Sequence, residues 1–448
     1  MIHAFEYRGK YLVLDVESGA VQRLDKPSYD VVCALEAGSD VYALPYPHSE
    51  IEEILSEIDA LKAAGLFDSP MPPAPKRTLE SSAIKSVCLN IAHDCNLRCK
   101  YCFAETGEYK GGRMLMSRET ARKALDFLMV SSKNRHNLEV DLFGGEPLMN
   151  FDVVKDVVAY GRELEKKFNK RIHFTITTNG VALNDEIIDF INKEIFNLVI
   201  SIDGRKWVHD AQRVTPNGKG SYDMIVPKAQ KLIKQRGDKE YYVRGTYTAN
   251  NLDFTEDVKA LVDLGFEQIS VEPVVLKPDE PFAINDDNVD KAIAEYDKLL
   301  EYVIERDRMG KPFNFFHFMI DLDDSPCLVK RTLGCGVGVE YVAVAPNGDI
   351  YPCHQFVGDE NFRLGNVYEG KLNDEIRQKY LECNIFTKDR CRNCWAKYYC
   401  CGGCAANGYN LNGDIKQPPE VSCKLLRKRT ELAVGHALFK EEEKNEKR

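Results

Sequence analysis

Three cysteines within eight residues are the first part of the chain whose spacing suggests chemistry. Cys95, Cys99 and Cys102 follow the pattern C-x3-C-x2-C, directly after the apolar segment 87–93. Three thiolates spaced in this way can hold one face of a four-iron cubane cluster and leave the fourth iron open to another ligand. A zinc site that also uses His93 is the alternative, although zinc is more often held by pairs of C-x2-C knuckles.

A larger group of cysteines lies near the C-terminus. The chain has 15 cysteines, and ten of them follow residue 326. The N-terminus shows no basic stretch followed by an apolar one, so we expect no signal peptide and a cytoplasmic location, where thiols stay reduced. Metal ligation is then favoured over disulfides. A zinc ribbon is the alternative for Cys391, Cys394, Cys400 and Cys404 taken alone. The regularly spaced members of this group are Cys335, Cys353, Cys391, Cys394, Cys400, Cys404 and Cys423.

Strands and helices are predicted to alternate through the middle of the chain. Six segments rich in β-branched and aromatic residues indicate strands, and helical periodicity lies between them. Such an alternation predicts a parallel sheet with right-handed crossovers, either open or closed into a partial barrel. Ligands of both architectures gather at the C-terminal ends of the strands. The predicted strands span residues 87–93, 138–143, 172–178, 197–202, 242–248 and 268–275.

Small or charged residues stand at the ends of the second, third and fourth predicted strands. Glycine allows close approach of the backbone to a ligand. The carboxylate of Glu146 suits an ammonium group, and the guanidinium of Arg213 suits a carboxylate. Turn or helix-cap roles are the alternative for the strand-end residues, and a surface salt bridge is the alternative for Arg213. The candidate ligand-binding residues are Gly144, Gly145, Glu146, Asn179, Ser201, Asp203 and Arg213.

The first cysteine motif, with Tyr101 before its last cysteine, resembles the signature of radical S-adenosylmethionine (SAM) enzymes. The resemblance implies a partial (β/α)6 barrel and a 4Fe–4S cluster on the three catalytic cysteines, whose open iron chelates the amino and carboxylate groups of SAM. It also implies reductive cleavage of SAM to a 5′-deoxyadenosyl radical. The turn at 144–146 resembles the family's turn that meets the methionyl amino group, and we expect Tyr101 and the other candidates to contact SAM as well.

The second cysteine group resembles the SPASM domain, a C-terminal extension of radical SAM enzymes that modify peptides and proteins. This resemblance implies two auxiliary 4Fe–4S clusters, and therefore three clusters in all. Two fully ligated cubanes need eight thiolates, so either Cys327 or a substrate thiolate completes the second. The implied ligand sets are Cys391, Cys394, Cys400 and Cys423 for one cluster, and Cys335, Cys353 and Cys404 for the other.

A proline-rich linker at residues 69–75 separates a small N-terminal segment from the barrel. With three predicted strands and two helices, this segment resembles the winged-helix-like domains that bind a leader peptide by adding it to a sheet edge. A structural cap on the barrel is the alternative. We therefore expect a leader-peptide recognition domain at 1–74, a radical SAM partial barrel at 75–310 and a SPASM domain at 311–448.

Taken together, the chain resembles the maturases of SCIFF peptides, a sactipeptide-type family. The resemblance implies a thioether (sactionine) bond between a cysteine sulfur and an α-carbon of a ribosomally made peptide. The expected partners are a cysteine-rich precursor peptide with a leader segment and a low-potential electron donor. One alternative is another SPASM enzyme, such as an anaerobic sulfatase-maturase-like oxidase. A non-catalytic iron–sulfur or zinc scaffold that presents peptides is the alternative from a different functional class.

Charge and hydropathy exclude two classes of partner. With 60 Lys and Arg against 70 Asp and Glu among 448 residues, the net charge is −10. An acidic chain is a poor candidate for nucleic-acid binding, which needs clustered basic residues. The chain has no run of 18 apolar residues, so we expect no membrane partner either.

Overall fold

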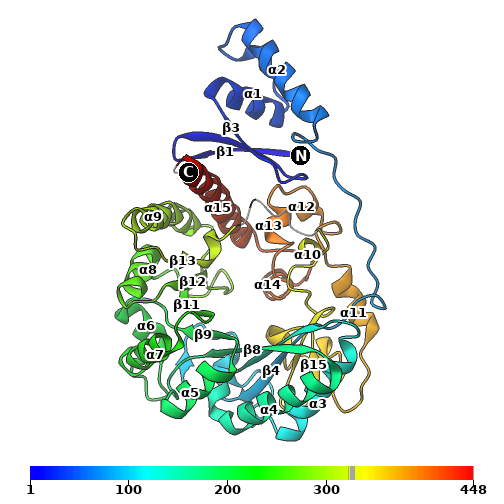
Figure 1. The fold of residues 1–448 in the computed structure, drawn as a ribbon, viewed down its shortest axis with the longest axis vertical. Helices are drawn as coiled ribbons and strands as arrows, with labels where there is room; N and C mark the ends of the chain where they lie inside the picture. The colour runs from blue at the N-terminus through cyan, green and yellow to red at the C-terminus, as the bar shows by residue number, and fades with distance from the viewer. Residues whose placement is uncertain (321, 323–327, 447–448) are drawn as a thin grey trace.

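A mostly parallel sheet, with antiparallel strands at one end, forms the centre of the molecule in a computed structural model, which describes residues 1–320, 322 and 328–446 (Figure 1). Its main path runs in the order β13-β12-β11-β9-β8-β7-β4-β14-β15-β16. The six strands expected from the sequence are neighbours here and pair in parallel, which confirms the α/β class. They are β4 (Ser86–His93), β7 (Asn137–Gly144), β8 (Arg171–Thr178), β9 (Asn197–Ser201), β11 (Tyr241–Tyr247) and β12 (Gln268–Pro273).

Helices cover the outside of the curved sheet (Figure 1). The apolar faces of these helices pack on every second residue of the strands. In β8, Phe174 is fully buried and its ring packs against Gly161 of α4, whereas the next residue, Thr175, faces the barrel interior. Ser117 caps α3 by accepting a hydrogen bond from Thr120 N. The barrel helices are α3 (Arg118–Ser131), α4 (Phe151–Phe168), α5 (Asp185–Glu194), α6 (Lys206–Gln212), α7 (Tyr222–Arg236), α8 (Phe254–Asp263) and α9 (Val289–Arg308).

The N-terminal segment is a three-stranded antiparallel sheet with two helices. One sheet face, which includes Val13, packs on these helices. The other face carries Phe5 and Tyr7 and belongs to the same apolar core as the C-terminal helix α15. The segment is therefore docked through a shared core. Its elements are β1 (Ile2–Tyr7), β2 (Lys10–Asp15), β3 (Val21–Leu24), α1 (Lys26–Glu36) and α2 (His48–Ala63).

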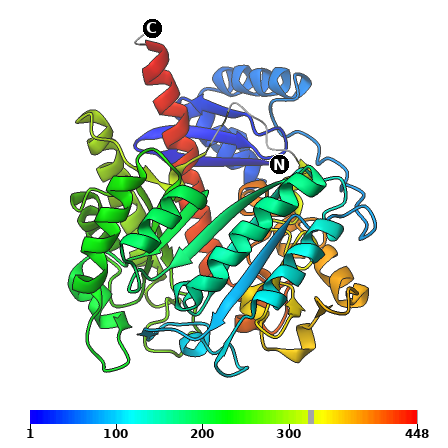
Figure 2. The same cartoon turned by 60° about the horizontal axis from the view of Figure 1, so that its bottom comes forward.

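The C-terminal part continues the barrel sheet. The strand β14 (Tyr341–Val344) pairs in parallel with β4, so the sheet crosses the predicted boundary at residue 310. The helix α15 (Glu420–Glu446) runs beside α9 and passes the N-terminal sheet (Figures 1 and 2). The division into three domains stays a prediction. The other C-terminal elements are β13 (Asn314–Phe315), β15 (Asp349–Tyr351), β16 (Gly365–Asn366), α10 (Leu328–Thr332), α11 (Asp374–Leu381), α12 (Asp389–Arg392), α13 (Lys397–Cys400) and α14 (Ala405–Asn412).

Within the part of the chain that the structure describes, no helix combines the length and apolar character needed to cross a bilayer.

Candidate functional site

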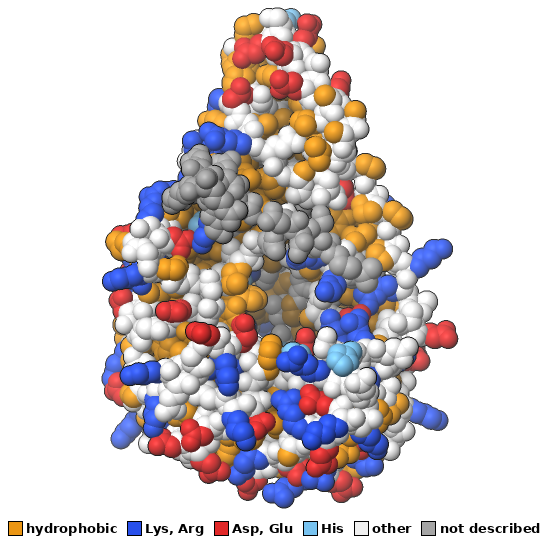
Figure 3. All heavy atoms as spheres, viewed as in Figure 1, with side chains coloured by type: hydrophobic (Ala, Val, Ile, Leu, Met, Phe, Trp, Pro, Cys, Tyr) orange, Lys and Arg blue, Asp and Glu red, His pale blue; other side chains and the backbone are white. Residues whose placement is uncertain are grey.

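A cavity of about 520 Å³ lies at the C-terminal ends of the barrel strands, a size typical of small-molecule sites. The barrel lines one side with the first cysteine motif and the ends of β7, β8, β9, β11 and β12. The C-terminal part lines the other side. Figure 3 shows the molecule hollowed near the middle of the face seen in Figure 1. Six cysteines from both groups border this one cavity: Cys95, Cys99, Cys102, Cys400, Cys404 and Cys423.

The first three cysteines lie together on the loop after β4. Burial raises the pKa of the Cys95 thiol to about 12 and that of Cys99 to about 11, and the neighbouring thiols add to both shifts. Asn179 Nδ2 lies 3.5 Å from Cys95 Sγ and 2.8 Å from Asn96 Oδ1. The amide therefore fixes this loop against the end of β8. Buried, mutually close thiols of this kind release their protons when a metal binds.

The glycine turn after β7 brings that strand against the cysteine loop. Gly144 has φ +131°, and a Cβ on Gly145 would lie 2.2 Å from the carbonyl oxygen of Asp94. Only glycine permits so close an approach. Glu146 follows with 1 % of its surface exposed, and burial raises its pKa to about 7.

Three protein donors already satisfy the Glu146 carboxylate. Leu148 N and Thr178 Oγ1 donate to Oε1 at 3.0 and 2.7 Å, and Asn179 N donates to Oε2 at 2.8 Å. Glu146 thus ties the ends of β7 and β8 together. It also lines the cavity, and its expected contact with an ammonium group stays a prediction.

A buried charge pair supports the far side of the cysteine motif. Asp203 is fully buried and accepts hydrogen bonds from Tyr101 Oη at 2.7 Å, Arg213 Nε at 3.0 Å and Thr246 N at 3.0 Å. Arg213 is 9 % exposed, so a surface salt bridge is wrong for this residue. Tyr101, Arg213 and Ser201 line the cavity. Asp203 does not; it holds the residues that do.

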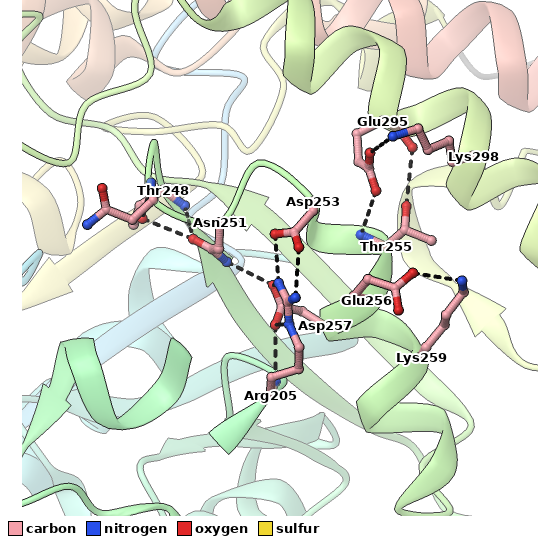
Figure 4. A network of polar contacts seen from close by, with 11 residues as sticks. Arg205, Thr248, Asn251, Asp253, Thr255, Glu256, Asp257, Lys259, Glu295 and Lys298 are labelled. Atoms are coloured by element: carbon pink, nitrogen blue, oxygen red, sulfur yellow. Dashed lines mark hydrogen bonds and ion pairs between the residues drawn. The ribbon is translucent and has the colours of Figure 1, made fainter. Parts of the chain in front are cut away.

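The loop that carries Asp203 is itself held by a polar network, drawn in Figure 4. Arg205 Nε donates to Asp257 Oδ1 at 2.8 Å, and its terminal nitrogens donate to Asp253 at 2.7 Å. Gly204, with φ +115°, leaves no room for a Cβ, which would lie 2.3 Å from Asp257 Cβ. The start of α8 therefore clamps the turn after β9.

The second cysteine group divides into two sets in space. The thiols of the first set surround a small cavity of about 40 Å³, and burial together with neighbouring thiols raises the pKa of Cys391, Cys400 and Cys423. In the second set, burial is the larger cause and Cys404 a smaller cause of the raised pKa of Cys335 and Cys353. Cys327 lies outside the described residues. The first set is Cys391, Cys394, Cys400 and Cys423, and the second is Cys335, Cys353 and Cys404.

Two family models match the chain where these two cysteine groups lie. The radical SAM superfamily model matches residues 89–235, and the SPASM model, described as an iron–sulfur cluster-binding domain, matches residues 335–395. An uncharacterized protein of Methanocaldococcus jannaschii is 30% identical over 319 residues, which are 70% of this chain and 96% of that protein. The chain belongs to the radical SAM superfamily.

Characterised relatives of this radical SAM chain have more than one activity. A cysteine-type anaerobic sulfatase-maturating enzyme of Clostridium novyi is 25% identical over 344 residues, covering 70% of this chain and 86% of its own. The antilisterial bacteriocin subtilosin biosynthesis protein AlbA of Bacillus subtilis is 27% identical over 342 residues, covering 72% and 67%. Relatives at similar identity thus carry different activities.

The fold has solved counterparts. The crystal structure of Streptococcus suis SuiB bound to its precursor peptide SuiA aligns with a TM-score of 0.54 and 16% identity, covering 94% of this chain and 98% of SuiB. The alignment leaves 6% of this chain uncovered, which is less than its N-terminal segment. The likeness in fold therefore extends into residues 1–74.

Radical SAM and SPASM domains imply iron–sulfur clusters and SAM, and the donor sets fit these groups. Three half-buried thiols share the barrel loop, and four thiols enclose a small cavity. Thiolates are the usual ligands of iron–sulfur clusters. Among the described residues, no three His, Cys, Asp or Glu side chains converge closely enough to enclose a single metal ion, so the zinc alternatives gain no structural support.

Several residues of this radical SAM cavity were not foreseen from the sequence. Arg244 and Thr246 come from β11, Glu272 from β12, His354 from the turn after Cys353 and Arg429 from α15. In β11 and β12, alternation separates these positions from the apolar face of the strand, but it does not show that they line a cavity. Nothing in the sequence places α15 beside the barrel mouth.

Proposed function

We propose that this chain is a radical SAM maturase that forms a thioether (sactionine) bond between a cysteine sulfur and an α-carbon of a ribosomally made precursor peptide. The observation that carries the proposal is the single cavity bordered by Cys95, Cys99 and Cys102 on one side and by Cys400, Cys404 and Cys423 on the other. A peptide segment in that cavity lies next to both cysteine groups at once. That arrangement suits a reaction that joins a sulfur to a carbon.

The proposed site contains three 4Fe–4S clusters and SAM. Cys95, Cys99 and Cys102 would hold the catalytic cluster, and the two SPASM sets would hold the auxiliary ones. Their donor chemistry supports this allocation. The proposed SAM-binding residues are Tyr101, Gly144, Gly145, Glu146, Asn179, Ser201 and Arg213; Asp203, expected from the sequence to contact SAM, would instead hold Tyr101 and Arg213 in place.

When bound, the catalytic cluster and SAM supply a carbon radical that abstracts a hydrogen atom from the peptide. The chain's own residues position and protect this chemistry. The guanidinium of Arg213, held by Asp203, faces the cavity beside Cys99 and suits a carboxylate. Asn179 holds the loop of Cys95. Apolar side chains such as Phe143 and Val274 line the cavity and help to keep water out.

The proposed substrate is a cysteine-rich precursor peptide with a leader segment. SuiB was solved with its precursor peptide, and its fold matches 94% of this chain. The edges of the three-stranded sheet β1-β2-β3 offer a place for strand addition by a leader. A low-potential electron donor would reduce the catalytic cluster. We further propose a cytoplasmic location, where the cluster thiolates stay reduced.

A second candidate function is oxidation of a single side chain, as in anaerobic sulfatase maturation. The identity to the Clostridium novyi enzyme supports it, because 25% over 70% of the chain is close to the value for AlbA. The donor sets described above fit either reaction.

Turnover of a cysteine-rich precursor peptide by the reconstituted enzyme tests the proposal. We expect SAM-dependent formation of 5′-deoxyadenosine and a peptide that loses two hydrogen atoms. Tandem mass spectrometry should place these losses on two residues joined through sulfur. Oxidation of one residue without a bond to another would favour the second candidate, and absence of 5′-deoxyadenosine would contradict both.

A further inference from the structure

One wall of the cavity carries positive charge that neither the clusters nor the proposed SAM site uses. Arg244 and Thr246 extend from β11 into the cavity, and Arg429 reaches it from α15. Glu272, at the end of β12, is the one acidic side chain among them. This wall connects the barrel mouth to the helix that carries Cys423.

The charges of Glu272 and Arg429 offset each other. Glu272 Oε1 lies 2.9 Å from His317 Nε2, and its Oε2 accepts a hydrogen bond from Arg429 Nη1 at 3.3 Å. Both oxygens of the carboxylate are thus engaged. The Arg429 side chain is 12 % exposed and its guanidinium lies 5.9 Å from the ring centroid of Tyr296. Arg429 is therefore held between Glu272 and Tyr296, and each oxygen of Glu272 already has one partner.

Among the described residues of this wall, Arg244 is the cation without a hydrogen-bonded or ion-paired partner. Its side chain is exposed within the cavity. It forms no side-chain hydrogen bond or ion pair with another residue that the structure describes. Among the described residues that line the cavity, the other carboxylate is that of Glu146, and three protein donors satisfy it. A planar guanidinium with five donors is suited to a carboxylate, which it binds through two parallel hydrogen bonds.

Arg244 and Arg213 serve different parts of the cavity. Arg213 pairs with Asp203 and lowers the pKa of Cys99, so it belongs to the side of the first cysteine motif. The charge of Arg244 acts instead on Glu272, His317 and His354. The SAM carboxylate already has a suitable partner in Arg213, which leaves Arg244 for another anion.

We propose that Arg244 binds a carboxylate of the peptide substrate and so selects peptides with an acidic group close to the modified residue. The inference rests on the proposed peptide-maturase function. Two sources can supply this chemistry, an Asp or Glu side chain and the α-carboxylate of the peptide terminus. Pairing inside a partly apolar cavity is stronger than in bulk water, so the acidic group would contribute to both affinity and register.

The test is a binding cycle between enzyme and peptide. Each short labelled peptide contains one cysteine, a single Asp at one of several positions beside it and an amidated C-terminus, and each has a matched peptide with Asn in place of Asp. A further pair of peptides contains no acidic side chain, and the two members differ only in having a free or an amidated C-terminus. Fluorescence anisotropy with the cluster-loaded, SAM-bound enzyme measures each affinity. A charged hydrogen-bonded pair corresponds to about a tenfold to hundredfold preference for one acidic peptide over its neutral partner.

The preference for the Asp peptide over its Asn partner should disappear in Arg244→Gln and persist in part in Arg244→Lys. In Arg244→Glu it should reverse, so that a peptide with Lys at the same position binds more tightly. The matched control is Arg171→Gln, an exposed arginine at the opposite end of β8, which should keep the preference. The inference would be overturned if Arg244→Gln lost equal affinity for the acidic and the neutral peptides, or if it bound SAM more weakly. Wild-type enzyme that makes no peptide-dependent 5′-deoxyadenosine would instead refute the proposed function, so the two failures are distinguishable.

Discussion

Arg213 and Asp203 form an ion pair inside the barrel, with 3.0 Å between Arg213 Nε and Asp203 Oδ1. The same carboxylate accepts the hydroxyl of Tyr101 and the backbone N–H of Thr246. One buried side chain therefore fixes a residue of the cysteine motif, the candidate carboxylate-binding arginine and the neighbouring strand. Asp203 acts on the cavity through these partners.

Replacing Asp203 by Asn should leave the buried guanidinium of Arg213 without its counter-charge. Breaking a buried pair in this way costs about 3–5 kcal/mol. We expect a lower melting temperature and weaker SAM binding, measured by thermal unfolding and by titration with SAM. Asp253→Asn is the control, because Asp253 is 55 % exposed and such pairs contribute about 1 kcal/mol or less. Equal effects of the two substitutions would contradict the role given to Asp203.

Replacing Cys95, Cys99 and Cys102 together by Ala should abolish all SAM cleavage. The iron of one cluster should be lost and that of the auxiliary clusters kept, because their thiols lie on other elements. Iron analysis and detection of 5′-deoxyadenosine check both points. Cys33→Ala, a change of the same chemistry in α1, should alter neither. Continued formation of 5′-deoxyadenosine by the triple variant would show that the catalytic cluster lies elsewhere.

The sequence predicts local order better than it predicts contacts between distant segments. The strands predicted over 172–178 and 197–202 lie within a residue of those ranges, because the residue pattern of a strand is a local signal. The cavity residue Arg429 was not expected, because it depends on where α15 docks. Arg244 was missed for a related reason: on a strand, one arginine at an alternate position has the same pattern whether it faces solvent or a cavity.

The docking of the N-terminal segment should weaken as pH rises. His3 Nε2 lies 3.0 Å from Glu431, its Nδ1 lies 3.8 Å from Glu36, and its ring stacks on Trp395. Burial lowers the pKa of His3, but the two carboxylates outweigh burial and raise it above its usual value. Charged His3 therefore stabilises the folded state fully below about pH 6.5, and this contribution is lost as pH rises through the higher folded pKa.

Hydrogen exchange of β1 at about pH 6 and about pH 8.5 measures this effect. Protection should be higher at the lower pH in the wild-type protein, and the difference should shrink in His3→Gln. The matched control is His48→Gln, since His48 begins α2 away from these carboxylates. An unchanged pH dependence in His3→Gln would exclude His3 as its source.

Gly435→Ala should destabilise the same docking contact. Alanine usually stabilises a helix interior by about 1 kcal/mol relative to glycine. Here its Cβ would lie 2.3 Å from a ring carbon of Tyr7, and overpacking of this kind costs about 1–3 kcal/mol. Denaturant unfolding should therefore show a net loss of stability. Adding Tyr7→Leu should recover part of it, and a stabilised single variant would show that the two elements are not in firm contact.

Cys400 and Cys401 provide an internally matched test of the auxiliary sites. Cys400 borders both the small cavity and the large one, and burial together with the nearby thiols of Cys391 and Cys394 raises its pKa. Cys401 follows with φ +59°, and its sulfur points to the carbonyl oxygen of Tyr398 at 3.7 Å. Cys400→Ala should therefore lose the iron of one auxiliary cluster together with peptide turnover, since a missing thiolate removes a cluster ligand. Cys401→Ala should keep full iron content and full turnover, because its thiol faces the protein backbone.

The two purified variants can be compared by iron and sulfide analysis and by mass spectrometry of the peptide after turnover. Equal iron loss in both variants would assign Cys401 to the cluster as well.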